Sequence, residues 1–387
     1  MKYRIGEICS TVSETYKGKD PFVVLINTSD VLKGFVTNHS KTKNEKLAGQ
    51  FKKTFKKDDI LYSEIRPANR RYAYVDFDDT SLYIASTKLM VIRANTSIVN
   101  SRFLFYLLTS EEIIKRLQHL AETRSGTFPQ ITFSSEISPI EVDIPSLEEQ
   151  NKIVDILRII DEKTHLNDLM NTSLEEQIST IFKERIARFD NVPDDWNRSS
   201  LDSIADYLNG LPMQKHPPKE NDKTLPVLKI AELKKGFCDE TSDRCSTDFD
   251  KKYLIHDGDV VFSWSASLFV DIWCGGLAGL NQHLFKVTSS HYDRWFYYCW
   301  TKYHLDSFIR EASAKATTMG HITRDRLTKA EVLIPDKTTY NSVGGIISSM
   351  IERIILNRFQ NNVLIEMKSQ IQKKLLESSL IDGEDKD

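Results

Sequence analysis

Apolar side chains recur every three or four residues between Leu147 and Gln177, and this spacing predicts one long helix. The apolar stripe continues to Arg185 but is interrupted near its middle by Asn167 and Asn171. Its positions, which step by four and three as in a coiled coil, are Ile153, Leu157, Ile160, Thr164, Asn167, Asn171, Leu174, Ile178, Ile181 and Arg185. A helix of about 40 residues is roughly 60 Å long, so we expect it to extend beyond a compact domain of this size.

The same stripe returns 190 residues later, with both asparagines at matching steps as Asn357 and Asn361. Its positions are Val343, Ile347, Met350, Ile354, Asn357, Asn361, Leu364, Lys368, Ile371 and Leu375. We predict that the two helices pair as an antiparallel coiled coil in which the four asparagines meet near the centre. A buried amide pairs well only with another amide at its own level, so these residues are expected to fix the helix register. The alternative is that they lie at a helix crossing or an edge, open to water.

Residues 1–146 and 190–336 show a different pattern, in which short β-type runs are separated by polar turns. Such runs are PFVVLIN (21–27), SLYIASTKLMVIRA (81–94), GDVVFSWSASLFVDIW (258–273) and QHLFKV (282–287). Each segment also contains a helical stretch, at 101–122 and at 292–313. The predicted fold class is therefore α+β, with two mixed α/β domains that alternate with two long helices.

The predicted domain boundaries fall near three prolines. They give a first domain at 1–146, a central helix at 147–189, a second domain at 190–336 and a C-terminal helix at 337–382. Pro145, Pro193 and Pro335 support these boundaries because the residue before a proline is pushed out of helical conformation.

Short matches in the same order support an internal repeat at an offset of 190 to 200 residues. RIGEIC (4–9) matches SLDSIA (200–205), KKDDILYS (56–63) matches IHDGDVVFS (255–263), GTFPQIT (126–132) matches TTMGHIT (317–323), and VDIPS (142–146) matches VLIPD (332–336). Each match is weak alone, but their common order predicts a duplicated chain with approximate two-fold symmetry.

Composition limits the class of protein. Hydrophobic residues make up 40% of the chain and charged residues 28%, and no apolar run approaches the ~20 residues of a membrane span. The N-terminal residues MKYRIGEICS show no export signal. Five cysteines without a C-x-x-C pair fit a reducing compartment. We therefore expect a cytoplasmic protein without a membrane span, a metal or a cofactor.

The net charge of -3 does not by itself favour a nucleic-acid partner. Between Lys41 and Arg71, however, ten Lys and Arg residues stand against four acidic residues. Such a concentrated basic stretch can bind a polyanion even when the rest of the surface is acidic. The alternative is a solvated lysine-rich loop.

A family resemblance rests on three segments. IPSLEEQNKIVDILRIIDEKTHLNDLMNTSLEEQISTIFKERI (144–186) resembles the central conserved segment of specificity subunits of type I DNA restriction-modification enzymes. VPDDWNRSSLDSIADYLNG (192–210) and HDGDVVFS (256–263) resemble parts of a target recognition domain in that family. The chain departs from the pattern at its N-terminus, which lacks VP-x-x-W, and at IPDKTTYNSV (334–343), which lacks a second LEEQ. By organisation the resemblance covers the whole chain.

The resemblance implies a DNA-recognition subunit without catalysis of its own. Each recognition domain would bind one half of a split double-stranded DNA target, with the half-sites about one helical turn apart or somewhat more. The long helices would set this spacing and dock two modification (methyltransferase) subunits. Restriction (motor-nuclease) subunits would join them to form the restriction enzyme.

Known catalytic motifs are absent from the sequence. It contains no G-x-x-x-x-G-K-[ST], G-x-G-x-x-G, H-E-x-x-H or G-x-S-x-G, and no Asn- or Asp-Pro-Pro-aromatic tetrapeptide of the kind that holds a flipped base. CGGLAGL (274–280) stands between strand-like runs, so we interpret it as a turn or bulge.

Two other functions stay open at this point. The chain could be a non-catalytic coiled-coil adaptor that binds only proteins in another defence complex, and salt-dependent, sequence-dependent DNA affinity would separate this function from the first. A self-contained nuclease is disfavoured, because no metal-binding carboxylate cluster has a recognisable spacing in the sequence.

The candidate DNA-binding residues come from the basic stretch and from loops that recur in both halves. Lys52, Lys53, Lys56 and Lys57 are candidates for phosphate contacts, and Arg66, Arg70 and Arg71 in the loop 63–75 are candidates for guanine contacts in the groove. The recurring loops 123–132 and 315–323 add Arg124, Ser125, Gln130, Lys315, Thr317 and His321. ASTKL (85–89) matches LNQHL (280–284), which adds Lys88, Gln282 and His283. A glutamine can pair with adenine through two hydrogen bonds.

Overall fold

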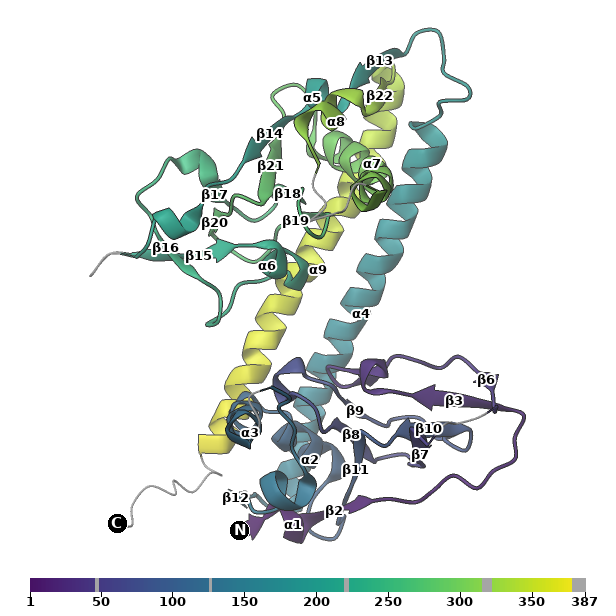
Figure 1. Cartoon of the computed structure of the whole chain (residues 1–387), viewed down its shortest axis with the longest axis vertical. Coiled ribbons are helices and arrows are strands. Elements are labelled where there is room, and N and C mark those ends of the chain that lie inside the picture. The colour runs from purple at the N-terminus through teal and green to yellow at the C-terminus, as the bar shows by residue number, and fades with distance from the viewer. Residues whose placement is uncertain (46–48, 125–126, 219–222, 315–321, 378–387) are drawn as a thin grey trace. The chain divides into compact units, whose positions relative to one another are not determined.

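The computed structural model describes residues 1–45, 49–124, 127–218, 223–314 and 322–377, and the chain divides into two compact units. Unit 1 comprises Met1–Glu162 and Leu364–Asp387, and unit 2 comprises Lys163–Val363. Each unit holds one mixed α/β domain and a part of each long helix (Figure 1). Because the units cut across both helices, the division of the sequence into four segments stays a prediction.

Domain 1, the globular part of unit 1, contains two four-stranded sheets, with strand orders β2-β11-β8-β9 and β6-β3-β10-β7. Their strands are β2 (Cys9–Val12), β3 (Phe22–Ile26), β6 (Thr42–Lys43), β7 (Phe51–Lys53), β8 (Ile60–Ser63), β9 (Tyr72–Tyr74), β10 (Tyr83–Ser86) and β11 (Leu89–Ala94). Two-stranded sheets join β1 (Lys2–Arg4) to β12 (Glu141–Asp143) and β4 (Val31–Leu32) to β5 (Phe35–Val36).

Domain 2, the globular part of unit 2, repeats this topology in two four-stranded sheets, with orders β14-β21-β18-β19 and β16-β15-β20-β17. Their strands are β14 (Asp206–Asn209), β15 (Thr224–Leu228), β16 (Arg244–Ser246), β17 (Leu254–Ile255), β18 (Val260–Ser263), β19 (Phe269–Ile272), β20 (Ala278–Leu280) and β21 (Leu284–Thr288). A two-stranded sheet joins β13 (Asn197–Ser200) to β22 (Glu331–Ile334). β3 pairs in parallel with β10, and β15 pairs in parallel with β20. The two domains are therefore copies of one fold.

In each domain most helices pack on the sheet that contains β2 or β14, and the short helix Ile230–Lys235 packs against β15 of the other sheet. The helices are α1 (Ile5–Ile8), α2 (Ser101–Leu108) and α3 (Glu111–Arg124) in domain 1, and α5 (Leu201–Ile204), α6 (Ile230–Lys235), α7 (Arg294–Ala314) and α8 (Arg324–Lys329) in domain 2. The helical stretch predicted at 101–122 consists of two separate helices, α2 and α3. The hydroxyls of Thr109 and Ser110 donate to the Phe105 and Leu107 carbonyls, and these local bonds accompany the end of α2.

The described structure also contains short helical segments of about one turn. They are η1 (Thr28–Asp30), η2 (Pro67–Asn69), η3 (Phe133–Ile137), η4 (Met213–Lys215) and η5 (Lys251–Tyr253).

The apolar runs of the central strands in domain 1 reflect burial on both faces of the sheet. Along β8, Ile60 and Tyr62 pack into the core cluster that contains α2 and α3, while Leu61 packs into the cluster shared by the two sheets. This alternation follows from the two-residue period of a strand. The sheet therefore has a helix layer on one side and the second sheet on the other.

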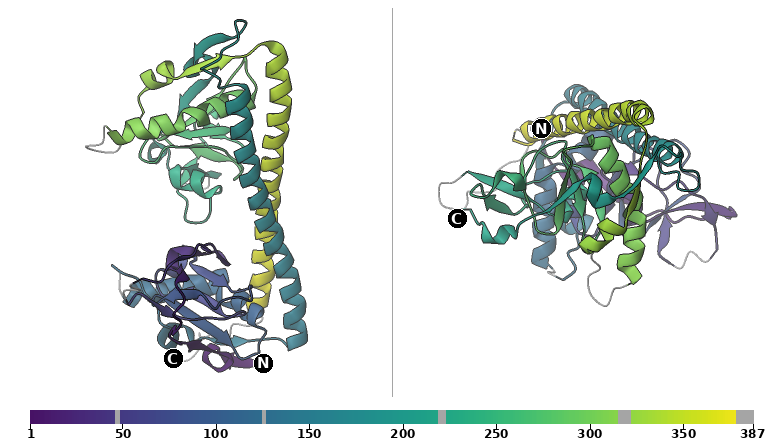
Figure 2. Two further views of the ribbon diagram at one scale, coloured as in Figure 1. Left: turned by 90° about the vertical axis from the view of Figure 1, so that its right-hand side faces the viewer. Right: turned by 90° about the horizontal axis from the view of Figure 1, so that it is seen from above.

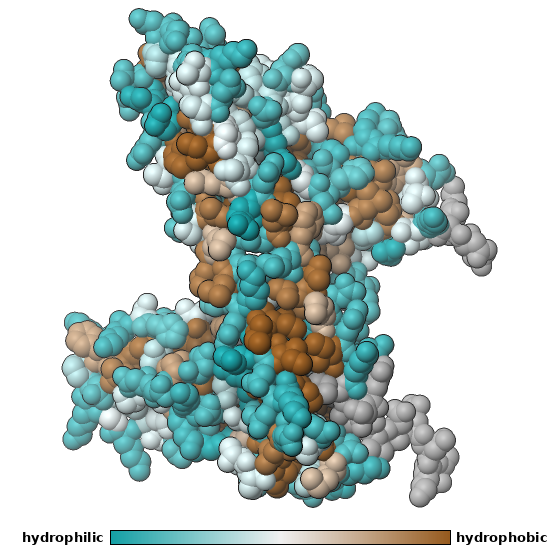
Figure 3. Space-filling view, turned by 180° about the vertical axis from the view of Figure 1, so that it is seen from behind, coloured by the Kyte–Doolittle hydropathy of each residue, from teal (hydrophilic) through white to brown (hydrophobic). Residues whose placement is uncertain are grey.

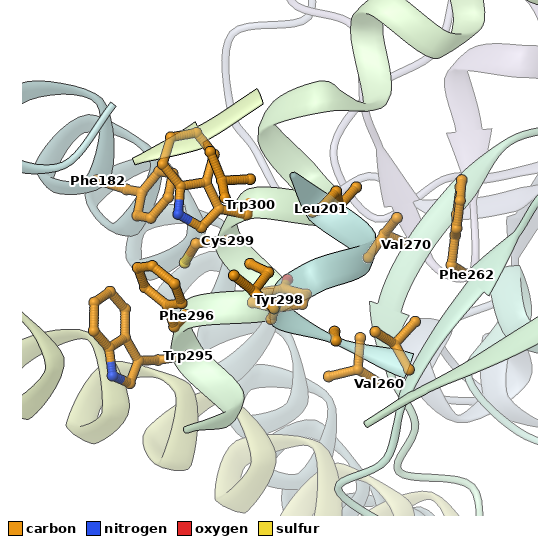
Figure 4. Packing of buried hydrophobic residues seen from close by; sticks show 14 of the residues in the cluster. Phe182, Leu201, Val260, Phe262, Val270, Trp295, Phe296, Tyr298, Cys299 and Trp300 are labelled. Atoms are coloured by element: carbon orange, nitrogen blue, oxygen red, sulfur yellow. The ribbon is translucent and has the colours of Figure 1, made fainter. Parts of the chain in front are cut away.

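Domain 2 has the same layered core. Val260 and Phe262 of β18 pack into the cluster that contains α7, and Val261 packs into the second cluster. Figure 4 shows the larger side chains of the first cluster, among them Trp300 of α7 and Phe182 of the first long helix. Their rings lie edge to face with centroids 4.9 Å apart, so domain 2 packs directly on that helix.

The two long helices, α4 (Leu147–Arg185) and α9 (Lys337–Glu377), lie side by side and antiparallel in each unit (Figure 1, Figure 2). In unit 2 the Asn167 Nδ2 donates to the Asn361 Oδ1 at 2.8 Å, and the Asn357 Nδ2 donates to the Asn171 Oδ1 at 2.9 Å. The offset of 190 residues relates Asn167 to Asn357 and Asn171 to Asn361. Each of the two bonds is therefore the counterpart of the other, as two-fold pseudosymmetry requires. All four side chains are at most 7% exposed, so they are not open to water. Their role in fixing the helix register stays a proposal.

In unit 1 an ion pair joins the same two helices. The Lys368 Nζ lies 2.5 Å from the Asp161 Oδ1 and sits over the Tyr106 ring. The Gln372 Nε2 donates to the Tyr106 carbonyl at 3.0 Å, and Ile371 packs against the core of domain 1. Domain 1 is therefore attached to both helices of its unit.

A half-buried ionic network attaches domain 2 to the helices of unit 2. The Arg358 guanidinium on α9 donates to the Asp271 carboxylate at 2.9 Å, to the Ile272 carbonyl at 2.8 Å and to the Glu175 carboxylate of α4 at 3.3 Å. The Lys302 ammonium on α7 lies 2.8 Å from Glu175. Burial raises the pKa of Asp271 even beside this arginine. Each charge in the network has a partner of opposite sign, which offsets part of the cost of shielding it from water.

Candidate nucleic-acid interface

Three segments of domain 1 meet where β8 ends. The Glu64 N–H donates to the Lys88 carbonyl in the β10–β11 turn at 3.0 Å, and the Ile131 N–H donates to the Glu64 carbonyl at 2.8 Å. These bonds bring three residues singled out in the sequence, Arg66, Lys88 and Gln130, to the neighbourhood of Glu64. We call these four residues site 1.

Domain 2 has the equivalent arrangement at the end of β18. The Trp264 N–H donates to the His283 carbonyl at 3.4 Å, and the Ile322 N–H donates to the Trp264 carbonyl at 3.0 Å. These are the counterparts of the two bonds at Glu64. We call Trp264, Ser265, Gln282 and His283 site 2.

The backbone is strained at the same place in both domains. Arg66 has a φ of +44° and Ala266 a φ of +56°, a left-handed conformation that is uncommon for residues other than glycine. The Ser63 and Ser263 hydroxyls each donate to the carbonyl two residues later at 3.3 Å. Such strain costs on the order of 1–3 kcal/mol and clusters at functional sites. Its recurrence makes these loops the candidate functional loops of the two domains.

Site 1 combines charged groups with an amide. The Gln130 Nε2 donates to the Glu64 Oε2 at 3.0 Å, and the Lys88 Nζ lies 3.8 Å from the same carboxylate. The Glu64 side chain is 18% exposed, whereas Arg66 and Lys88 are exposed residues. Within the described part of the chain, the Arg66 guanidinium has no partner. Site 1 can therefore present two cations and an amide to a ligand around one shielded carboxylate.

Site 2 is built from aromatic and neutral polar groups. The Trp264 Nε1 donates to the Asn209 Oδ1 at 2.9 Å, and its ring lies 6.1 Å from the His283 ring. The Ser265 hydroxyl lies 3.0 Å from the His283 Nδ1, and the Gln282 Nε2 lies 3.3 Å from the His283 Nε2. Rings and amides of this kind can stack on a base or bond to its edge.

The lysines of the basic stretch differ in how far their ammonium groups are exposed and in whether the fold already binds them. The Lys53 ammonium donates to the Thr87 carbonyl at 3.0 Å and to the Leu89 carbonyl at 2.7 Å, and burial lowers the pKa of Lys53. Lys52 and Lys56 are exposed. Lys57 is exposed and pairs with Asp78 at 2.7 Å, which raises the pKa of Lys57. Lys52 and Lys56 are thus the members of this group most open to a ligand.

The other arginines predicted at the interface have partners in the fold. Arg70 donates to Glu111 at 2.8 Å, Arg124 donates to Glu136 at 3.1 Å, and Arg71 donates to a backbone carbonyl of η1 at 3.0 Å. Four predicted residues lie outside the described residues: Ser125, Lys315, Thr317 and His321.

Sequence reasoning missed Glu64, Trp264, Ser265 and Asn209. A positional signal existed, because Glu64 and Trp264 directly follow the last matched serine of KKDDILYS and IHDGDVVFS. The search for loops with similar residues in both halves passed over them, since an acid and an indole share no chemistry. The shared feature is the backbone position.

In each unit the long helices also carry exposed large apolar side chains (Figure 3). We call them the outer apolar residues: Ile156, Ile159, Leu166, Leu169 and Met170 on α4, and Ile346, Leu356, Val363, Ile365 and Met367 on α9. The offset of 190 residues relates Ile156 to Ile346 and Leu166 to Leu356. Exposed apolar surface of this kind marks interaction sites.

Other kinds of site find little support in the described part of the chain. None of its His, Cys, Asp and Glu residues form a group of three that could hold a metal ion. The five cysteines are free thiols, four of them buried. None of its helices combines the length and the apolar character of a membrane span.

A family model matches most of the chain in two copies. The family is described as the type I restriction modification DNA specificity domain, and the matches cover residues 1–176 and 193–367. Each match takes in one domain and most of the long helix that follows it.

Individual relatives agree with the family match. The specificity subunit of the type I restriction enzyme HindI from Haemophilus influenzae is 42% identical over 209 residues, which are 54% of this chain and 44% of that protein. The MjaIX specificity subunit from Methanocaldococcus jannaschii is 23% identical over 302 residues, which are 72% of this chain and 68% of that protein. The alignment thus spans less than half of the first relative.

A solved structure shares the fold. The crystal structure of the type I restriction-modification system S subunit from M. genitalium matches with a TM-score of 0.55 and 12% sequence identity. The match covers 97% of this chain and 96% of that one.

Proposed function

This chain belongs to the type I restriction modification DNA specificity domain family, and we propose that it is the DNA-recognition subunit of a type I restriction-modification system. It binds a bipartite double-stranded DNA target in the cytoplasm, with one half-site on each domain. It needs no cofactor and catalyses no reaction, because methylation and cleavage belong to its partner subunits.

The observation that carries this proposal is the recurrence of one loop arrangement in both domains. Site 1 and site 2 share their backbone bonds and their strained residue, Arg66 or Ala266. Their side chains differ. Two scaffolds of equal shape with different side chains suit a protein that recognises two different half-sites.

In domain 1 the groups split into phosphate and base contacts. Lys52, Lys56 and Lys88 are exposed cations that suit phosphates, and the exposed Arg66, whose guanidinium has no partner among the described residues, has a fork that suits guanine O6 and N7. Arg70 and Arg71 stay weaker candidates because the fold already uses their guanidinium groups. In domain 2, Gln282 and His283 remain the candidates for base edges.

The long helices supply the docking surface and the spacing. We assign the outer apolar residues to two modification subunits, since each long helix carries such residues and two of them on α4, Ile156 and Leu166, have apolar counterparts on α9. Restriction subunits join through that complex. The asparagine pairs Asn167–Asn361 and Asn171–Asn357 fix the helix register, which keeps the distance between half-sites constant.

The test is DNA binding by the full chain in complex with its modification subunits. We expect sequence-dependent affinity that falls steeply with salt, because phosphate contacts release counterions. Arg66→Ala should reduce discrimination in one half-site, and Arg198→Ala, an exposed arginine paired with Glu331 on the β13–β22 sheet, is the matched control. Equal affinity for all DNA sequences would rule out the proposal.

In the alternative function, a protein-binding adaptor, the same outer apolar residues would bind the partner subunits. An adaptor would bind the partner subunits as tightly as expected here but show no preference among DNA sequences. The binding experiment therefore separates the two functions.

A further inference from the structure

We infer that Gln130 reads an adenine in the half-site of domain 1 and that Glu64 is the positioning residue which presents it. This inference rests on the proposed function, since it concerns the base chemistry that site 1 selects. It starts from the hydrogen bond between the Gln130 Nε2 and the Glu64 Oε2 at 3.0 Å.

The bond to Glu64 determines which way the Gln130 amide faces. An ionised carboxylate only accepts hydrogen bonds, so Gln130 turns its NH2 group, and not its oxygen, toward Glu64. One N–H is then used. The second N–H and the Oε1 make no other bond within the described part of the chain. One donor beside one acceptor is the pattern that matches N7 and N6 of adenine in the major groove.

The surrounding backbone holds both partners of this bond in place. Ile65 and Gln130 form an antiparallel bridge, and the Ile131 N–H donates to the Glu64 carbonyl at 2.8 Å. The two side chains therefore leave neighbouring stretches of backbone whose separation is fixed. A glutamine placed in this way loses less conformational freedom when it binds a base than a glutamine on an unsupported loop.

Lys88 offsets the negative charge of Glu64, which would otherwise repel the DNA phosphates. Its ammonium lies 3.8 Å from the Glu64 carboxylate, which is largely shielded from solvent. The pair reduces the repulsion that a lone acid would exert on phosphates. Glu64 can then orient Gln130 without a large electrostatic penalty for binding.

The arrangement is specific to domain 1 among the described residues. The equivalent of Glu64 in domain 2 is Trp264, whose indole N–H donates to Asn209 and which has no carboxylate to accept from an amide. The two half-sites should therefore differ at the base pair that faces these positions.

The experiment uses the full chain in complex with its modification subunits, and DNA selected by the wild-type complex from a random-sequence library. Competition binding then measures each single base-pair substitution in the selected target. With Gln130→Ala, discrimination at one A·T pair of one half-site should fall roughly tenfold to a hundredfold. The other half-site should keep its preferences.

Variants of Glu64 test the positioning role. Glu64→Ala should lose discrimination at the same A·T pair, and Glu64→Gln should restore part of it, because its Oε1 can still accept from Gln130. Asn44→Ala is the matched control, since its amide bonds to the Asp20 carbonyl away from site 1. Should Gln130→Ala fail to fold, Gln130→Met keeps the side-chain length without hydrogen bonds.

Two results would overturn the inference while leaving the proposed function intact. One is an unchanged preference at every base pair with Gln130→Ala, and the other is an equal loss of affinity for all sequences. If the wild-type complex selects no bipartite sequence, the proposed function itself is wrong.

Discussion

At the scale of single residues, the two domains use one backbone arrangement for different chemistry. Glu64 and Trp264 occupy equivalent positions, and both take part in the same two backbone hydrogen bonds. The backbone therefore defines where a side chain stands, and the side chain defines what it can bind.

The hydrogen bonds between the buried asparagines predict a loss of stability when one of these residues is replaced. Asn361→Ala removes the acceptor of the Asn167 Nδ2 and leaves a buried amide with fewer partners. The free energy of unfolding should fall by about 1–3 kcal/mol in urea titrations. Gln370→Ala, at an exposed site of the same helix, should change it by less than about 0.5 kcal/mol. Equal effects of the two substitutions would show that the asparagine pair adds no stability.

The burial of His304 predicts how the stability of the chain depends on pH. His304 lies against Trp300 with ring centroids 5.9 Å apart, and its Nε2 bonds to the Glu331 carbonyl at 2.8 Å. Burial lowers the pKa of His304. The unfolded chain therefore binds a proton at a pH where the folded chain does not. The stability that depends on neutral His304 is complete above the ordinary histidine pKa and is lost as pH falls toward the lowered value.

The expected result is a smaller pH dependence for His304→Gln, which keeps a donor for Glu331 but does not titrate. Urea unfolding at about pH 7 and at about pH 5 should show a larger loss of unfolding free energy for the wild-type chain. Losses of equal size would mean that His304 does not contribute to acid sensitivity.

At the scale of elements, one ion pair breaks the symmetry of the helix pairing. Asp161 and Lys368 pair in unit 1, whereas the positions related to them by 190 residues, Ile351 and Ile178, are both buried and apolar in unit 2. If α4 paired with a second copy of itself, Asp161 would face Ile178 and lose its partner. The ion pair thus favours α4 with α9 over either helix with itself.

Charge reversal tests this pairing rule. Asp161→Lys places two ammonium groups together and should lower the free energy of unfolding by about 1–3 kcal/mol. Adding Lys368→Asp should recover most of the loss, and a double-mutant cycle in urea gives the coupling energy. Additive losses in the double variant would contradict a direct interaction.

The sequence predicts the elements better than the site, because periodicity is local and the site is not. The two helices with their asparagines follow from steps of three and four residues. The break after Leu108 does not, since it involves hydroxyl bonds to the backbone at Thr109 and Ser110. Three segments that are distant in the sequence meet at site 1, so the sequence marks the position of Glu64 in the repeat but not its bonds to the other two segments. For the same reason, the two carbonyl partners of Lys53 were not predictable.

At the scale of the whole molecule, the proposed function requires a constant distance between half-sites, and α4 and α9 each run from one unit into the other. Insertion of seven residues after Glu162 and of seven after Val363 would lengthen both helices by roughly 10 Å. Seven residues also preserve the heptad phase, so the pairing within each unit should persist. Because base pairs are stacked about 3.4 Å apart, the spacer between the half-sites should grow by about three base pairs.

The matched control inserts seven residues after Glu162 alone. The two helices then differ in length between the units, so this variant should lose stability or affinity, whereas the double insertion keeps both half-sites. Selection of DNA from a random-sequence library, with each chain in complex with its modification subunits, gives the half-sites and the spacer separately. If the double insertion selects the original half-sites with the original spacer, the helices do not set the distance. The spacing would then have to come from the domains or the partner subunits.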